Sequence, residues 1–152
     1  DAKSKEKIEI ENKVVEKAVE ISEIDVPEVM IDNQIQSEIS QFEYRLRMQG
    51  LDIDKYLELT NTTIEDFKEQ IKPLAEKKVR ADLVLEEIAK VEKLEITDKD
   101  IDDELERLAI EYNQEDVEKF KEDMKKGDLE YLESGIIKDK TIELLVKNTK
   151  FI

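Results

Sequence analysis

Carboxylates are the side chains through which this chain could do chemistry. Asp and Glu supply 41 of its 152 residues, whereas His and Cys are absent. Without these two residue types the chain has no thiolate nucleophile, no imidazole base and few ways to hold zinc. The sequence contains no phosphate-binding loop, no dinucleotide fingerprint and no nucleophile elbow. Acid pairs are so frequent that none stands out as catalytic. We therefore expect neither enzyme activity nor a cofactor.

One acidic run is spaced like the start of a calcium-binding loop. Asp98, Asp100 and Asp102 occupy alternate positions, as the first ligands of such a loop do. The sixth position of that loop needs Gly and is Asp103, and the twelfth needs Glu and is Ala109. An apolar helical face also runs through the segment. We interpret the run as the acidic first turn of a helix, which the helix dipole favours, and expect no metal site.

The composition predicts an all-α protein. Charged residues make up 43% of the chain and hydrophobic residues 39%, with 3 Gly and 2 Pro. Such a mixture suits amphipathic helices, but it has few apolar residues for a large spherical core, so we expect an elongated, well-solvated body. The net charge of −16 makes nucleic acid and anionic membrane surfaces poor partners. No apolar run approaches the roughly 20 residues that span a bilayer.

Apolar residues at helical spacing predict a succession of helices. Val26-Pro27 should separate the first two, because proline restricts the residue before it and suits a helix start. Pro73 should kink the fourth helix or divide it in two. By residue number, the predicted helices cover 3–21, 28–48, 53–59, 64–93, 98–112, a short helix after 113, and 129–147.

Side chains at the predicted helix starts should cap them. Thr97 and Asp100 have the spacing of a capping box, in which the two side chains satisfy backbone amides of the first turn. The other expected caps are Thr62 with Glu65, Asn113 and Asp128. Gly135, inside the last helix, is expected to mark close helix packing.

Two groups of apolar residues fall at the expected tips of helical hairpins, where few neighbours can bury them. We expect these hairpins over residues 28–93 and 98–148, projecting from a shared body. Met fills irregular contacts and Tyr joins an apolar face to a polar edge, so both suit an adaptable binding surface. Packing between the legs of each hairpin is the alternative for any single residue. The candidate binding residues are Tyr44, Leu46, Met48, Leu51 and Tyr56 at the first tip and Leu108, Tyr112, Val117 and Phe120 at the second.

Two stretches carry a resemblance to a known family. Residues 83–112 read LVLEEIAKVEKLEITDKDIDDELERLAIEY, and residues 26–32 read VPEVMID. In this order and at about this separation, they resemble the C-terminal domain of bacterial trigger factor, a chaperone that meets polypeptides leaving the ribosome. The similarity covers nearly the whole chain, although outside these stretches it is mostly helical pattern.

The resemblance implies a single helical chaperone domain over residues 1–152. Its two arms would protrude from an elongated body and hold unfolded or nascent polypeptides without ATP. Leu108, Tyr112, Val117 and Phe120 match positions on the second arm, and Met48 is the closest match on the first. A bacterial cytoplasmic location is also implied. The family's ribosome-docking and peptidyl-prolyl isomerase domains have no counterpart in this sequence, so ribosome binding would need the missing N-terminal domain.

Two other functions compete with this hypothesis. A helical scaffold or adaptor with one dedicated protein partner is the second, and a carboxylate-based enzyme is a distant third. Composition does not separate the chaperone from the scaffold, whereas the two family-like stretches favour the chaperone. Open apolar surface also favours self-association of the isolated body.

Overall fold

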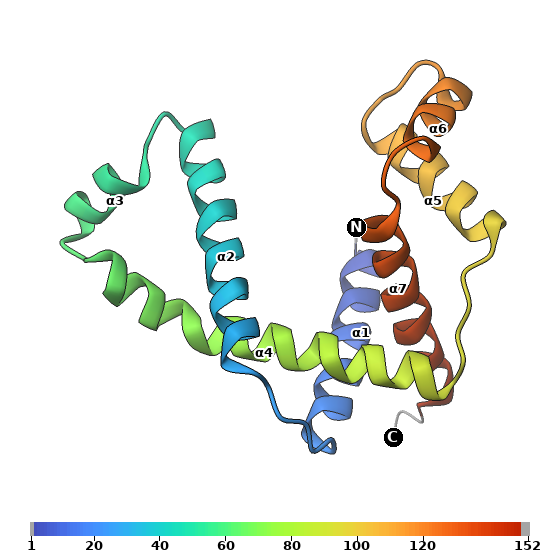
Figure 1. Ribbon diagram of the computed structural model, residues 1–152, viewed down its shortest axis with the longest axis horizontal. Helices are drawn as coiled ribbons and strands as arrows, with labels where there is room; N and C mark the ends of the chain where they lie inside the picture. Colours follow the sequence, from blue (N-terminus) through green and yellow to red (C-terminus); the bar gives the residue numbers. More distant parts are fainter. Residues whose placement is uncertain (1, 150–152) are drawn as a thin grey trace. The chain divides into compact units, whose positions relative to one another are not determined.

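The computed structural model describes residues 2–149, and these residues form helices with no strand (Figure 1). The all-α prediction is therefore confirmed. Most predicted helices begin and end within two residues of the observed ones, and the second matches at both ends. The helices are α1 (Ala2–Glu20), α2 (Glu28–Met48), α3 (Ile53–Thr60), α4 (Ile64–Val91), α5 (Asp98–Glu111), α6 (Val117–Lys125) and α7 (Glu130–Asn148).

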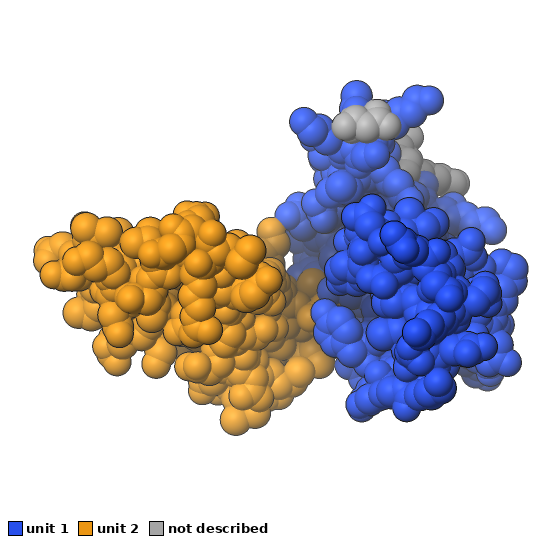
Figure 2. Space-filling model, turned by 90° about the horizontal axis from the view of Figure 1, so that it is seen from above, with its two compact units in different colours: residues 1–20, 85–152 blue, residues 21–84 orange. Residues whose placement is uncertain are grey.

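The chain forms two compact units, which Figure 2 colours separately. Unit 2 is residues 21–84 and holds α2, α3 and most of α4. Unit 1 combines the described residues up to Glu20 with those from Leu85 onward. The boundary falls inside α4, between Val84 and Leu85. The single domain and the arm ranges 28–93 and 98–148 stay predictions.

Unit 2 is built around the apolar stripe of α2. Ile31, Ile35 and Ile39 recur every four residues, so they share one face of the helix, and all three are buried against Ala75 of α4. Burying an aliphatic side chain of this size contributes about 1.5–3 kcal/mol. Partly buried residues complete this core: Val26, Ile53, Ile64, Phe67 and Ile71.

Ion pairs join α2 to α4 beside this core. Lys72 Nζ lies 2.8 Å from Glu28 Oε1, and Lys78 pairs with Glu38. Gln34 Nε2 donates a second hydrogen bond to Glu38 at 2.8 Å. The bond from Lys78 lowers the pKa of Glu38, which outweighs the effect of partial burial. Both ion pairs are partly exposed, so they add little to the apolar packing of α2 against α4.

In unit 1, α1 packs against α7, and α5 packs against both α6 and α7. Leu105 and Ala109 of α5 are fully buried, as is Thr141 of α7. The Thr141 hydroxyl donates to the carbonyl of Ile137 at 2.7 Å, so its burial leaves no polar atom unsatisfied. The predicted Thr97–Asp100 capping box is confirmed: the Thr97 amide donates to the Asp100 carboxylate at 2.8 Å, and the Asp100 amide donates to the Thr97 hydroxyl at 3.2 Å.

Three predicted caps lie at other residues. Thr63, not Thr62, opens α4, because its hydroxyl accepts from the Asp66 amide at 3.1 Å. Asp116, not Asn113, caps α6, because its carboxylate accepts from the Lys119 amide at 3.0 Å. Asn113 instead has φ 52° and ends α5 in the left-handed conformation that Asn tolerates. The Asp128 carboxylate accepts from the Glu130 amide at 2.9 Å, but α7 begins at Glu130, so Leu129 and not Asp128 is its N-cap residue.

Two other expectations concern Pro73 and Gly135. Pro73 does not divide its helix, since α4 is continuous from Ile64 to Val91, and the kink expected there stays a prediction. Gly135 does not mark close packing, because nothing lies within 4 Å of the position that a Cβ atom would take there. None of the helices in residues 2–149 combines the length and apolar character needed to cross a bilayer.

Candidate functional site

The turn between α2 and α3 carries the first group of candidate residues, in unit 2. Gly50 has φ 76°, a conformation that L side chains rarely adopt, so it lets the chain leave α2 sharply. Asp52 then caps α3 by accepting from the Lys55 amide at 2.7 Å. The turn thus has a defined geometry, which holds the side chains on either side of it.

Exposure divides these candidates. Tyr44 is 65% exposed and Met48 72% exposed, whereas Leu51 and Tyr56 are half-buried. Leu46 is only 5% exposed, so the expectation that it contributes to an open surface is wrong. It continues the stripe that buries Ile39, seven residues earlier, and this spacing was the signal for its burial.

An aromatic cluster beneath this surface explains the position of Tyr56. The Phe42 ring lies 4.9 Å from the Tyr56 ring in an edge-to-face arrangement and 5.1 Å from the Phe67 ring. The Arg45 guanidinium lies 5.8 Å from the centre of the Phe42 ring. Such aromatic pairs contribute about 0.5–1.5 kcal/mol beyond simple burial. Tyr56 therefore ties α3 to α2 and α4 and offers only part of its ring to solvent.

The second group of candidates lies on α5 and α6, in unit 1. Tyr112, the residue that follows α5, is 62% exposed, whereas Leu108, Val117 and Phe120 are half-buried. Helices α5 and α6 pack against each other, so these four candidates belong to one helical hairpin.

Sequence reasoning did not single out Ile110 and Tyr131, two of the exposed apolar residues in the same unit. Ile110 is 67% exposed and Tyr131 is 93% exposed. Ile110 lies off the apolar stripe of its helix, which was a signal that it faces solvent. Tyr131 lies in the first turn of α7, and its spacing from the other apolar residues of that helix does not indicate whether it is exposed.

A buried lysine links α6 to α5. Lys121 Nζ lies 2.6 Å from Asp102 Oδ2, and Lys125 Nζ lies 2.7 Å from Asp102 Oδ1. The two lysines, Lys121 first, lower the pKa of the Asp102 carboxyl to about 2. The same contact raises the pKa of Lys121. The pair therefore stays ionised throughout the physiological range.

A second lysine joins α7 to the start of α5. Lys140 pairs with Asp100, and its ammonium also donates to the carbonyl of Glu95 at 2.7 Å. The bond from Lys140, followed by those from Thr97, lowers the pKa of Asp100 to about 2. Two carboxylates of the calcium-like run thus accept bonds from lysines. Among residues 2–149, no group of three or more acidic side chains is arranged to hold a metal.

These features define an all-helical domain that presents exposed apolar side chains among dense surface charge. A family model describing the C-terminus of bacterial trigger factor protein matches residues 1–147. The chain belongs to this family, which confirms the resemblance seen in the two sequence stretches.

Relatives and a solved structure agree with this assignment. The chain is 39% identical to trigger factor of Acetivibrio thermocellus over 99% of its length and 42% identical to that of Caldicellulosiruptor saccharolyticus over 96%. It covers 35% and 33% of those proteins, so it spans about a third of their length. A solved structure of trigger factor domains from Thermotoga maritima shares the fold, with a TM-score of 0.68, 22% identity, and coverage of 94% of this chain and 85% of that one.

Proposed function

We propose that this chain is the client-binding part of an ATP-independent chaperone, and that it holds unfolded or nascent polypeptides on exposed apolar side chains. The observation that carries the proposal is the exposure of Tyr44 and Met48 in unit 2 and of Tyr112 in unit 1. Water-exposed Tyr and Met within a family of this kind are suited to sequence-tolerant contacts. Leu51, Tyr56, Leu108, Val117 and Phe120 would supply the partly buried borders of these surfaces.

Weak binding at each surface suits such a function. A client that buries about 300 Å² of apolar area on one surface gains roughly 7 kcal/mol before costs. Loss of freedom on association costs about 4–15 kcal/mol, so one surface alone binds weakly. Several surfaces in one chain raise the effective concentration of the client and still let it leave stepwise as it buries its own core. No chemical step is required.

The chain's charge bears on its other partners and its location. A net charge of −16 disfavours nucleic acid and anionic membranes and favours clients that carry basic residues. Ribosome contact would come through segments of the longer relatives that this chain does not span. Because the proposed clients are nascent chains, we infer a bacterial cytoplasmic location. Self-association is a further expectation from its open apolar surface.

The test compares two double variants in the suppression of aggregation of several unrelated denatured proteins. Tyr44→Ser with Met48→Ser removes exposed apolar groups from the candidate surface. Ile8→Ser with Val91→Ser removes groups that are also exposed but outside it. We expect the first pair to weaken protection severalfold and the second to leave it nearly unchanged.

Circular dichroism shows whether both variants keep their helices. Equal loss of protection in the two variants would mean that binding does not occur at the candidate surface. Protection of no denatured protein by the unmodified chain, together with tight binding of one native partner, would support the scaffold instead.

A further inference from the structure

The sulfur of this chain is held in methionine alone. Cysteine is absent, as are histidine and tryptophan, so Met30, Met48 and Met124 are the side chains that a mild oxidant attacks most readily. A thioether that loses two electrons to a peroxide becomes a sulfoxide, which is polar and can be reduced again. The three methionines are therefore the candidate sites of a reversible modification.

Met48 is the most exposed of the three. Its exposed fraction is 72%, against 36% for Met30 and 38% for Met124. Met48 is the last residue of α2, and Gly50, with φ 76°, turns the chain sharply just after it. An oxidant has to reach the sulfur, so Met48 is the first of the three to react. An oxygen added there stays in water and does not enter the core of unit 2.

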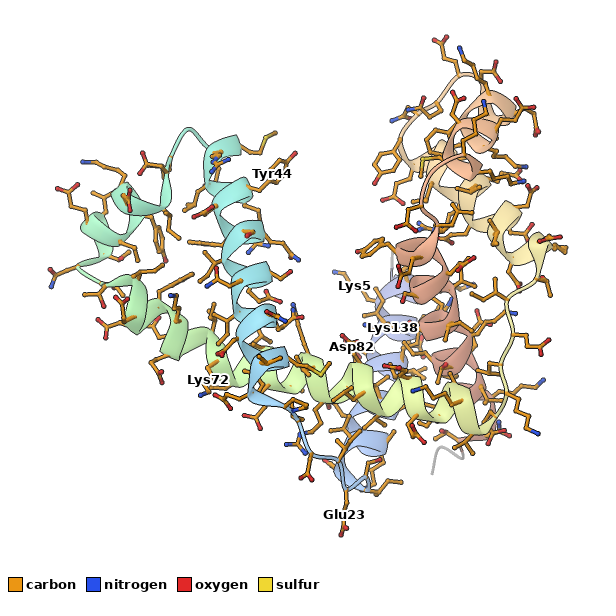
Figure 3. The ribbon with its side chains drawn as sticks, viewed as in Figure 1. Lys5, Glu23, Tyr44, Lys72, Asp82 and Lys138 are labelled. Atoms are coloured by element: carbon orange, nitrogen blue, oxygen red, sulfur yellow. The ribbon has the colours of Figure 1, made fainter. Side chains whose placement is uncertain are left out.

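Met48 is also the methionine that lies in the candidate client-binding surface. Tyr44, which is 65% exposed, precedes it by four residues, so the two side chains are neighbours on α2. Tyr44 lies on the side of α2 that faces away from α3 (Figure 3). A thioether beside an aromatic ring forms an apolar, polarisable surface that suits the apolar side chains of a client.

We propose that Met48 is a reversible oxidation site that controls client holding at the end of α2; this inference rests on the proposed function. A two-electron oxidant such as hydrogen peroxide transfers one oxygen atom to the Met48 sulfur. Its O–O bond breaks, the sulfur is oxidised, and the second oxygen leaves as water. Hydrogen peroxide is uncharged, so the net charge of −16 does not repel it. A methionine sulfoxide reductase reverses the step, in which two thiols become a disulfide and the oxygen leaves as water.

The sulfoxide weakens client binding because its oxygen is a strong hydrogen-bond acceptor. A client segment that covers oxidised Met48 strips water from this oxygen and gives no hydrogen bond in return, which is unfavourable. Before oxidation, the same contact buries an apolar group and is favourable. Because Met48 is mostly exposed, its oxidation lowers client holding without unfolding α2.

Mass spectrometry of the whole chain during mild peroxide treatment tests the site without any client. In the folded chain, Met48 should be oxidised about twofold faster than Met30 or Met124, in line with their exposed fractions. In concentrated urea the three rates should become equal, because packing no longer protects any sulfur. Equal rates in the folded chain, or slower oxidation of Met48, would overturn the proposal.

Two variants connect the site to the holding of denatured proteins. Met48→Leu keeps the other two methionines, whereas Met30→Leu with Met124→Leu keeps Met48 alone. Suppression of aggregation is measured for each variant before and after peroxide treatment. Peroxide should lower holding severalfold in the double variant and only slightly in Met48→Leu, and a methionine sulfoxide reductase with a dithiol should restore it. Circular dichroism checks that the oxidised chains keep their helices.

The outcomes separate this inference from the proposed function. Equal losses of holding in the two oxidised variants would overturn the control by Met48, as would full holding by the double variant once its Met48 is oxidised. An unoxidised chain that holds no denatured protein would overturn the proposed function and the control with it. The oxidation rates would then still decide whether Met48 is the preferred site.

Discussion

Lys121 Nζ on α6 lies 2.6 Å from Asp102 Oδ2 on α5, and the lysine side chain is only 9% exposed. A buried ammonium is tolerated when a carboxylate neutralises it, and Glu118, at 3.6 Å, is too exposed to replace Asp102. Lys121 is the most buried side chain of α6, beside the half-buried Val117 and Phe120, so this charge pair helps to hold α6 on α5.

Replacing Asp102 by Asn should therefore loosen α6 selectively. The variant leaves Lys121 buried without its main counter-charge, and α6 responds by opening. Hydrogen exchange of the α6 amides should become faster, while exchange in α2 and α4 stays unchanged. Asp103→Asn is a control, because Asp103 pairs with the exposed Lys99 instead. Uniform acceleration throughout the chain would contradict a local role.

The caps of α4 offer a second test. Thr63→Ala removes the hydroxyl that accepts from the Asp66 amide, and it should lower the free energy of unfolding by about 1 kcal/mol. Thr62→Ala removes a hydroxyl that donates to the carbonyl of Thr60 and should cost less than about 0.5 kcal/mol. Urea unfolding followed by circular dichroism measures both. A larger loss from Thr62→Ala would restore the capping box expected from the sequence.

Leu46 and Met48 lie within one turn of α2, and substitutions there can distinguish a packing role from a binding role. Leu46→Ala empties a buried site and should cost about 2–5 kcal/mol of stability. Met48→Ala changes an exposed side chain and should shift stability by less than about 0.5 kcal/mol. Affinity for a denatured protein should be lower in Met48→Ala than in Leu46→Ala, when both variants are measured well below their unfolding temperatures. A destabilising Met48→Ala would show that this side chain is packed.

The ionised carboxylate of Asp139, in α7, should lower the stability of the folded chain at neutral pH. Burial, followed by the negative charge of Glu104, raises the pKa of its carboxyl, and Glu11 and Glu143 act in the same direction against Arg107. The folded state therefore binds the proton of the Asp139 carboxyl more tightly than the unfolded state does. The protonated carboxyl stabilises the folded state at low pH, and this stabilisation is lost as pH rises through the raised pKa.

Asp139→Asn should therefore raise the thermal unfolding temperature at pH 7. The gain should fade as pH falls towards 3, where the natural carboxyl is protonated anyway. Asp102→Asn should instead lower the thermal unfolding temperature at pH 7. The lowered pKa of the Asp102 carboxyl stabilises the folded state above about pH 4, and this stabilisation is lost as pH falls towards 2. An Asp139→Asn chain that is less stable at pH 7 would mean that the carboxylate accepts a needed bond.

Much of the fold could be predicted because its signals are local. Pro27 and the four-residue spacing of Ile31, Ile35 and Ile39 define α2, and the Thr97–Asp100 box defines the start of α5. The position of the α4 cap could not be chosen from the sequence alone, because two adjacent threonines each have an acidic residue three positions later. Backbone geometry selects Thr63.

The candidate site was less predictable, because exposure depends on what packs across from a residue. Leu46 and Met48 are two residues apart and similarly apolar, yet one is buried and the other is open. Periodicity distinguishes them only once the buried stripe is followed to the end of α2. Gly135 resembles a packing glycine in sequence, but no neighbouring helix approaches it.

The dependence of α6 on Lys121 and Asp102 makes the two units unlike in their response to salt. Added electrolyte screens charge contacts at partly exposed sites, with a Debye length of about 8 Å at 0.15 M ionic strength. The aliphatic and aromatic core of unit 2 has no such sensitivity, and excluded salts such as sulfate strengthen it. Added salt therefore weakens the partly exposed contact of Lys125 with Asp102 and also the exposed ion pairs between α2 and α4, but it leaves the apolar core of unit 2 intact.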